Sequence, residues 1–197
     1  MSSYYRKPVK HKTALKEFKI LLVSLAIFWI VEIADFFVFN GSLDSYGIQP
    51  HSTIGLRGII FAPFLHGGFK HLIANSLPFL TLGWLTMIQD TNDFYFASIM
   101  SALIGGLGVW IFGSPNSVHI GASILIYGYL GFLLLRGYFQ KNMLSIAVSM
   151  FVAVAYGGFI MGVFPSEIGV SWQGHLFGFI GGAFAAKMVG QEKKSPS

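Results

Sequence analysis

The stretch VHIGASILIYGYLGFLLL (residues 118–135) decides the fold, because it runs its whole length without a charged side chain. A helix needs about 20 mostly apolar residues to cross the hydrocarbon core of a bilayer. The whole chain has this character: of its 197 residues, 54% are hydrophobic and 11% are charged. Soluble domains carry about 25% charged residues. We therefore expect an integral membrane protein that folds as one unit.

Six segments are long and apolar enough to be predicted as transmembrane helices. They are residues 20–39, 71–88, 94–112, 119–136, 143–163 and 171–189. The predicted fold class is accordingly all-α, a polytopic membrane protein with six transmembrane helices. Its expected parts are a basic N-terminal segment, a six-helix domain, a long apolar loop between the first two helices and a short tail. Their residue ranges are 1–19, 20–189, 40–70 and 190–197.

The basic residues predict the orientation, since lysine and arginine collect on the cytoplasmic side of membrane proteins. With both termini in the cytoplasm, 11 of the 13 basic residues lie inside, and only Arg57 and Lys70 lie outside. The inside set is Arg6, Lys7, Lys10, Lys12, Lys16, Lys19, Arg136, Lys141, Lys187, Lys193 and Lys194. This distribution accounts for the net charge of +5, so we expect no nucleic-acid partner.

Five polar residues fall near the external ends of predicted helices, where polar groups are rare and usually functional. His66, His71 and Asn75 belong to the opening of the second helix, HGGFKHLIANS. Ser123 opens the fourth helix, and His175 opens the sixth in SWQGHLFGFIGG. The predicted topology thus brings a serine, histidines and an asparagine from three distant segments to one depth.

These residue types suit nucleophilic catalysis. A serine hydroxyl becomes a nucleophile when an adjacent base takes its proton, and histidine is the usual base. Asparagine and imidazole N–H groups can stabilise an oxyanion, and the N-terminus of the fourth helix adds unpaired backbone N–H groups. Tyr127 lies on the same helix face as Ser123, and Gly121 permits close backbone approach. No acidic residue is placed to orient the imidazole, so a dyad is predicted.

Small residues predict which helices touch. Gly174, Gly178 and Gly182 recur every four residues in the sixth segment, and Gly128 and Gly131 lie in the fourth. Small residues at this spacing let membrane helices pack closely. We therefore expect these two helices to press together and bring His175 toward Ser123.

Other interpretations are weighed against this one. A serine in a membrane helix commonly bonds to the preceding turn or simply packs. His66, His71 and His175 could bind zinc, but they lack the H-E-x-x-H spacing, so no metal is expected. Without cysteine there is no thiolate ligand either. Glu32 and Asp35 in the first segment could form the proton relay of a transporter, although bonding to the 40–70 loop is favoured.

Together these residues resemble the rhomboid family of intramembrane serine proteases over residues 50–187. The matching pieces are H-x4-H-x3-N in the second helix, G-x-S-x (GASI) at the fourth and GHLFG in the sixth. The resemblance implies that Ser123 is the nucleophile and His175 the general base. It further implies oxyanion donation by His71 and Asn75.

The same resemblance assigns His66 a supporting role and Tyr127 a stacking role against the base. It implies transmembrane protein substrates, no cofactor and no metal. A bacterial plasma membrane is the expected location, with the active site opening to the external side. One position departs from the family pattern: Ile124 stands where most active members have glycine. The alternative is therefore a rhomboid-like pseudoprotease that binds membrane clients without cleaving them.

Overall fold

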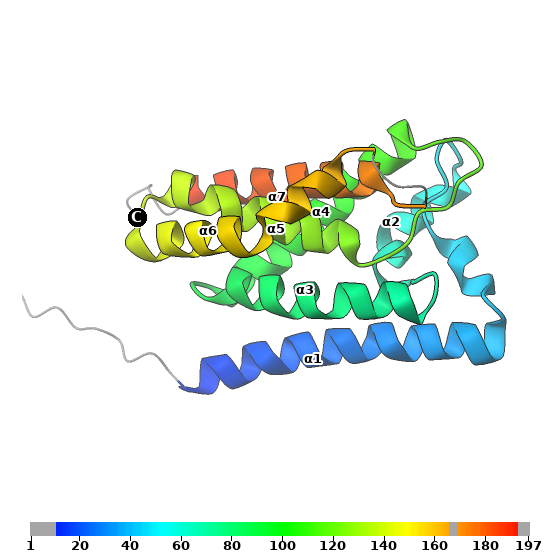
Figure 1. Cartoon of the computed structure of the whole chain (residues 1–197), viewed down its shortest axis with the longest axis horizontal. Coiled ribbons are helices and arrows are strands. Elements are labelled where there is room, and N and C mark those ends of the chain that lie inside the picture. The colour runs from blue at the N-terminus through cyan, green and yellow to red at the C-terminus, as the bar shows by residue number, and fades with distance from the viewer. Residues whose placement is uncertain (1–10, 166–168, 193–197) are drawn as a thin grey trace, which may run out of the picture.

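The computed structural model describes residues 11–165 and 169–192, and this part of the chain is helical almost throughout (Figure 1). The long helices are α1 (His11–Ala34), α3 (Phe69–Met87), α4 (Thr91–Phe112), α5 (Ser123–Gln140), α6 (Met143–Tyr156) and α7 (Trp172–Glu192). A π-helical turn, Asp35–Phe39, extends α1, and a 3-10 turn, Gly157–Val163, extends α6. The predicted all-α class is thus confirmed for the described residues.

Three stretches are long and apolar enough to cross a membrane by length and composition, namely Ala14–Phe39, Thr91–Phe112 and Met143–Val163. The chain is therefore an integral membrane protein. The other long helices, α3, α5 and α7, carry all the candidate polar residues except His66, which precedes α3, and most of the packing glycines. The first helix begins at His11, inside the expected N-terminal segment 1–19, whereas residues 1–10 and 193–197 lie outside the described part.

Helix α5 is the centre of the bundle and packs most extensively against α7. Glycines make this contact possible, because their backbones approach without intervening side chains. A Cβ atom added to Gly182 would collide with the Gly128 backbone, and one added to Gly178 would collide with the Ile124 backbone. The predicted close packing of these two helices on their small residues is confirmed.

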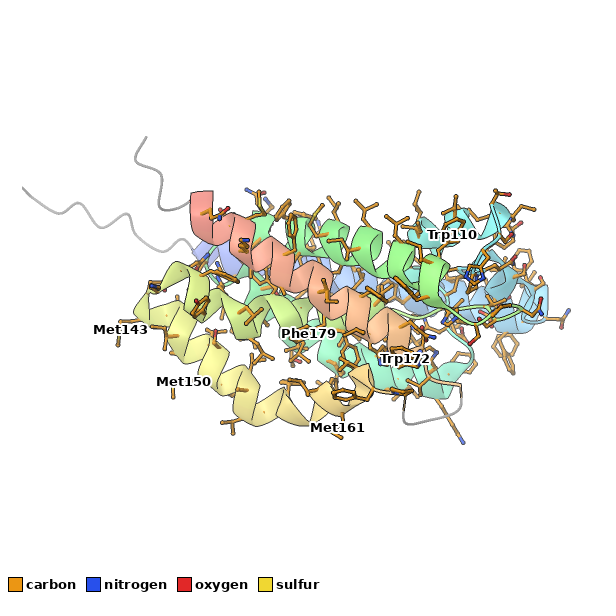
Figure 2. All side chains as sticks on the ribbon, turned by 90° about the horizontal axis from the view of Figure 1, so that it is seen from above. Trp110, Met143, Met150, Met161, Trp172 and Phe179 are labelled. Carbon is orange, nitrogen blue, oxygen red and sulfur yellow. The ribbon has the colours of Figure 1, made fainter. Side chains whose placement is uncertain are left out.

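Helices α1 and α6 lie at the periphery and present apolar side chains outward. Figure 2 shows Met143, Met150 and Met161 pointing away from the bundle, and Val154 on the same helix is 90% exposed. In a membrane protein such faces contact lipid. The polar chemistry of the chain is therefore confined to the interior and to the two ends of the bundle.

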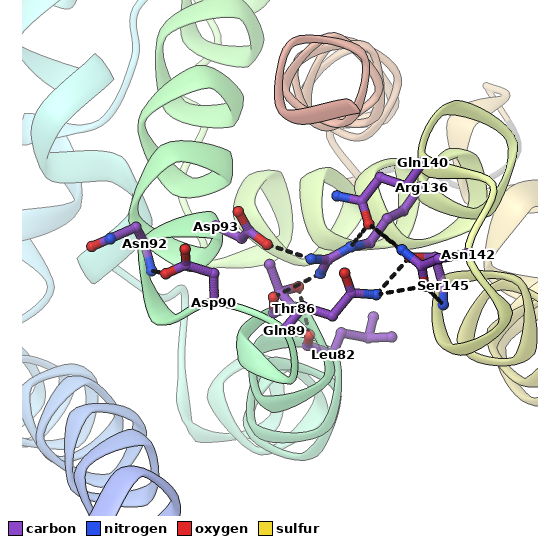
Figure 3. Close-up of polar contacts among 10 residues, drawn as sticks. All are labelled: Leu82, Thr86, Gln89, Asp90, Asn92, Asp93, Arg136, Gln140, Asn142 and Ser145. Carbon is purple, nitrogen blue, oxygen red and sulfur yellow. Dashed lines mark hydrogen bonds and ion pairs between the residues drawn. The ribbon is translucent and has the colours of Figure 1, made fainter. Parts of the chain in front are cut away.

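One end of the bundle is held by a buried ion pair. Arg136 and Asp93 join α5 to α4, and the arginine also donates to the Thr86 carbonyl at the end of α3 (Figure 3). Arg136 further donates to Gln140, which accepts from Ser145 of α6. Sequence analysis listed Arg136 among the cytoplasmic basic residues, at the end of the helix predicted over 119–136. It lies within α5 and is only 2% exposed.

The connection between α1 and α3 folds against the opposite end of the bundle. It contains short 3-10 turns at Ser42–Tyr46, Ile54–Arg57 and Ala62–Phe64, and the short helix α2 at Gly58–Phe61. Ile48 and His119 exchange two backbone hydrogen bonds of 3.0 and 2.9 Å. His51 bonds to the Ile111 carbonyl, and Trp110 donates to the Ser52 carbonyl. This loop is therefore an ordered cap over the end where α5 and α7 begin.

Candidate active site

Ser123 is the first residue of α5, so it stands at the end of the bundle covered by the connection. Gly121, two residues earlier, has a φ of +119°, a conformation that side-chain-bearing residues rarely adopt. A Cβ atom at Gly121 would lie 2.7 Å from His71 Cε1 and 3.6 Å from Asn75 Nδ2. Glycine is thus required here both for its φ and for the lack of space. Because Gly121 has no side chain, α3 can lie against the turn before Ser123.

His71 and Asn75 lie one turn apart on α3 and face this turn. The Gly67 N–H donates to Nδ1 of His71 at 3.4 Å, so in neutral His71 the proton is on Nε2. That Nε2 lies 2.8 Å from the Cβ position of Gly121. The Nδ2 group of Asn75 is buried and has no hydrogen-bond partner among the described residues. Two N–H donors are therefore directed at the backbone that precedes Ser123.

His175 lies in the first turn of α7, and its Nδ1 is 2.9 Å from the Gly162 carbonyl oxygen. A carbonyl can only accept, so Nδ1 carries the proton and Nε2 keeps its lone pair. This is the tautomer that a general base requires. The Gly162 carbonyl thus holds the imidazole in this tautomer, and sequence analysis could not foresee the contact because no Gly162 side chain is involved.

The rings of Tyr127 and His175 lie parallel, with centroids 3.9 Å apart and an interplanar angle of 9°. Tyr127 follows Ser123 by one helical turn and shares its face. The face of α5 that carries Ser123 is therefore the face against which the imidazole packs. The ring of Phe159 also stacks on Tyr127, with centroids 6.1 Å apart.

His66 contacts the same turn from the connection. Its Nε2 accepts the Ala122 N–H at 3.3 Å. Burial, together with the neighbouring His71, lowers the pKa of His66 to about 3. His66 is therefore neutral over the physiological range and keeps accepting this hydrogen bond, which fixes the residue immediately before Ser123.

The side chain of Ile124 points into the junction of three helices. A Cβ atom at Gly105 of α4 would lie 2.7 Å from Ile124 Cγ1 and 3.1 Å from the Gly178 nitrogen. The glycine at 105 thus leaves the space that the isoleucine fills. A small cavity beside Ser123 is lined in part by Ile124 and Gly121, so the isoleucine narrows the space next to the serine without replacing a backbone donor.

The packing also describes the residues of the two alternative site interpretations. Within residues 11–165 and 169–192, no group of three or more His, Cys, Asp or Glu side chains is arranged to hold a metal ion. Glu32 and Asp35 are 3% and 4% exposed. Asp35 accepts the Leu43 N–H at 2.9 Å, and Glu32 bonds to the Gly68 backbone. Both acids thus bind the connection to α1.

Comparison with known proteins gives a matching family. A model of the Rhomboid domain matches residues 54–192. This range includes the residues of the candidate active site, namely His66, His71, Asn75, Gly121, Ser123, Tyr127 and His175. The chain belongs to the rhomboid family. Two of its relatives are named rhomboid proteases, one of them as putative.

The "Rhomboid protease GluP" of Bacillus subtilis is 27% identical to this rhomboid over 188 residues, covering 89% of this chain and 35% of that protein. The "Putative rhomboid protease YdcA" of the same organism is 30% identical over 132 residues, 66% of this chain and 65% of that one. The "Uncharacterized protein Rv1337" of Mycobacterium tuberculosis is 41% identical over 178 residues, 86% of this chain and 73% of that one.

Proposed function

We propose that this rhomboid is an intramembrane serine endopeptidase that hydrolyses peptide bonds in or near the transmembrane segments of other proteins. Ser123 is the nucleophile and His175 the general base. Its six long helices span the bilayer, with both termini in the cytoplasm and the active site toward the external side. The partners are lipid and transmembrane protein substrates, and the chemistry uses neither cofactor nor metal.

The first half of the reaction forms an acyl-enzyme. Nε2 of His175 takes the Ser123 hydroxyl proton while Oγ attacks the scissile carbonyl carbon. The tetrahedral intermediate collapses when the C–N bond breaks and the imidazolium gives its proton to the leaving amine. The Gly162 carbonyl stabilises the imidazolium through the Nδ1–H bond of 2.9 Å.

The second half releases the acid product. His175 takes a proton from water, whose oxygen attacks the acyl carbon, and the imidazolium then returns a proton to Ser123 Oγ as the ester bond breaks. In both halves the negative charge on the carbonyl oxygen needs preorganised donors. His71 Nε2–H, Asn75 Nδ2 and the backbone N–H groups at the start of α5 supply them.

The observation that carries the proposal is the stack of Tyr127 on His175 at 3.9 Å. It sets a correctly protonated imidazole against the face of α5 that begins with Ser123. The unpartnered Nδ2 of Asn75 adds a second argument, because a buried amide donor without a partner costs free energy unless it has a function. An oxyanion formed at Ser123 would provide that partner.

The proposed orientation rests on how the charged residues are distributed between the two ends of the bundle. The basic residues predominate at the end away from Ser123, as expected for a cytoplasmic face. Arg136 lies thirteen residues after Ser123 on α5, which corresponds to about 20 Å along a helix. The candidate site and the buried ion pair thus mark opposite ends of the bundle.

The test is proteolysis in liposomes that contain the purified protein and a single-span substrate. The wild-type protein should cut the substrate, and Ser123→Ala and His175→Ala should each abolish the product. Cleavage that survives in both variants would reject the dyad. A correctly folded wild type that binds the substrate but never cuts it would instead establish the pseudoprotease alternative.

A further inference from the structure

A histidine outside the proposed dyad connects the two segments that carry Ser123 and His175. His119 lies in the loop between α4 and α5, four residues before Ser123. Its main chain is fixed by the two hydrogen bonds with Ile48, so the ring is held at a defined place over the end of the bundle. Its side chain reaches across to the segment that starts α7.

The imidazole of His119 bonds to two serine hydroxyls. Nε2 is 2.8 Å from Ser117 Oγ, and Nδ1 is 2.6 Å from Ser171 Oγ. The single hydroxyl proton of Ser117 is donated to the Ser114 carbonyl at 2.6 Å. Nε2 must therefore donate to Ser117, which leaves Nδ1 of the neutral ring to accept the hydroxyl proton of Ser171.

Ser171 in turn caps α7. Its Oγ accepts the Gly174 N–H at 3.3 Å, and its carbonyl oxygen accepts the His175 N–H at 3.1 Å. A serine in this position fixes where a helix begins. A continuous chain of bonds thus runs from His119 through Ser171 to the turn that carries His175.

The donors and acceptors in this chain are all satisfied when His119 is neutral. Neutral His119 donates from Nε2 and accepts at Nδ1, and both bonds are made. Burial lowers the pKa of His119, which favours the same neutral form. The loop before Ser123 and the first turn of α7 are therefore joined by a network with no unsatisfied hydroxyl or ring nitrogen.

We propose that His119 is a positioning residue that fixes the start of α7, and with it His175, relative to the Ser123 turn. This inference rests on the proposed protease function. His119 does not touch the reacting atoms and acts through Ser171. Its removal should affect the rate of the chemical step more than substrate binding, because the geometry at the dyad changes, although His119 and Ser171 also line the small cavity beside Ser123.

Three variants and a control distinguish the effect of losing the hydrogen bond to Ser171 from the effect of losing the volume of the His119 ring. His119→Phe keeps a ring but makes neither hydrogen bond, and Ser171→Ala removes the partner. His119→Asn keeps an acceptor oxygen near the position of Nδ1 and should preserve the contact with Ser171. Ser114→Ala is the control, since this exposed residue takes part only through its backbone carbonyl.

The expected result in liposomes is a loss of about 10- to 100-fold in kcat for His119→Phe and Ser171→Ala. KM should change by a smaller factor than kcat, since the proposed role is to position His175. His119→Asn should recover most of the lost rate, and Ser114→Ala should match the wild type. Wild-type kcat in His119→Phe, or a loss that appears in KM instead, would overturn the proposal.

A second measurement does not depend on catalysis. Amide hydrogen exchange at Gly174 should be faster in His119→Phe than in the wild type, because the cap loses its orienting partner, and close to wild type in His119→Asn. Unchanged exchange in His119→Phe would overturn the coupling even if activity fell. If the wild type neither cleaves nor binds covalently to a serine-directed probe, the proposed function fails, while exchange at Gly174 still decides whether His119 fixes α7.

Discussion

The imidazole of His175 lies parallel to the phenol ring of Tyr127 at a centroid distance of 3.9 Å. This contact joins the first turns of α7 and α5, and with the Gly162 carbonyl it holds the imidazole on both its face and its edge. The proposed base is thus oriented without any carboxylate.

Removing the Tyr127 ring should therefore impair catalysis more than folding. Aromatic pairs contribute about 0.5–1.5 kcal/mol beyond their burial, so Tyr127→Leu should lower kcat by up to about tenfold. Tyr127→Phe keeps the stack and should remain within about threefold of the wild type. Steady-state kinetics with a transmembrane substrate measures both variants. Equal activity in the leucine variant and the wild type would show that the stack does not orient His175.

Gly105 should be necessary for the stability of the fold, because Ile124 occupies the space beside it. A Cβ atom at Gly105 would lie 2.7 Å from Ile124 Cγ1, so Gly105→Ala should lower the free energy of unfolding by about 1–3 kcal/mol. Gly158→Ala is the matched control, since nothing lies within 4 Å of its Cβ position. Unfolding in mild detergent measures both.

The cause of this loss can be checked with Ile124→Ala, which removes the atoms that collide. The double variant Gly105→Ala/Ile124→Ala should lose less stability than the sum of the two single variants. Strict additivity would show that the two positions do not share this space, and the explanation of the isoleucine after Ser123 would then be wrong.

The buried Arg136–Asp93 pair should be costly to break from one side. Arg136→Met removes the cation beside a buried carboxylate and should cost about 3–5 kcal/mol of unfolding free energy. Lys187→Met, on the exposed side of α7, should cost little. The double variant Arg136→Met/Asp93→Leu should recover much of the loss, because apolar replacement of a whole buried pair is often tolerated. No recovery would mean that the arginine acts mainly through Thr86 and Gln140.

Asp44 should make stability depend on pH. Burial, followed by the charges of Asp35 and Glu32, raises the pKa of Asp44 from 3.8 to about 6. The folded state therefore holds this proton more tightly than the unfolded state, so stability should fall as pH rises from about 4 through about 6. Asp44→Asn mimics the protonated acid and should flatten the pH dependence in this window. An unchanged dependence in the variant would exclude Asp44 as its source.

Much of this architecture could be predicted from sequence. Apolar segments predicted the positions of the long helices within a few residues, except that α1 begins at His11 rather than at residue 20. The spacing of Gly178 and Gly182 predicted the contact between α5 and α7. The motif residues His71, Asn75, Ser123 and His175 follow from their order and expected depth. Their roles remain a prediction, as do the six spans and the orientation.

The remaining features could not be predicted, because they depend on backbone groups or on pairings between distant positions. The contact from the Gly162 carbonyl is made by the backbone, so no side chain in the sequence indicates it. His119 and Ser171 are 52 residues apart, and neither belongs to a motif that sequence analysis recognised. The burial of Arg136 could not be predicted, since its buried partner Asp93 lies 43 residues away.

The most direct test of the central claim is covalent labelling with a fluorophosphonate probe, followed by mass spectrometry of the labelled peptide. The account predicts one adduct on Ser123 in the wild type, none in Ser123→Ala and strongly reduced labelling in His175→Ala. An adduct on another residue, or undiminished labelling of Ser123 in His175→Ala, would contradict the Ser123–His175 dyad.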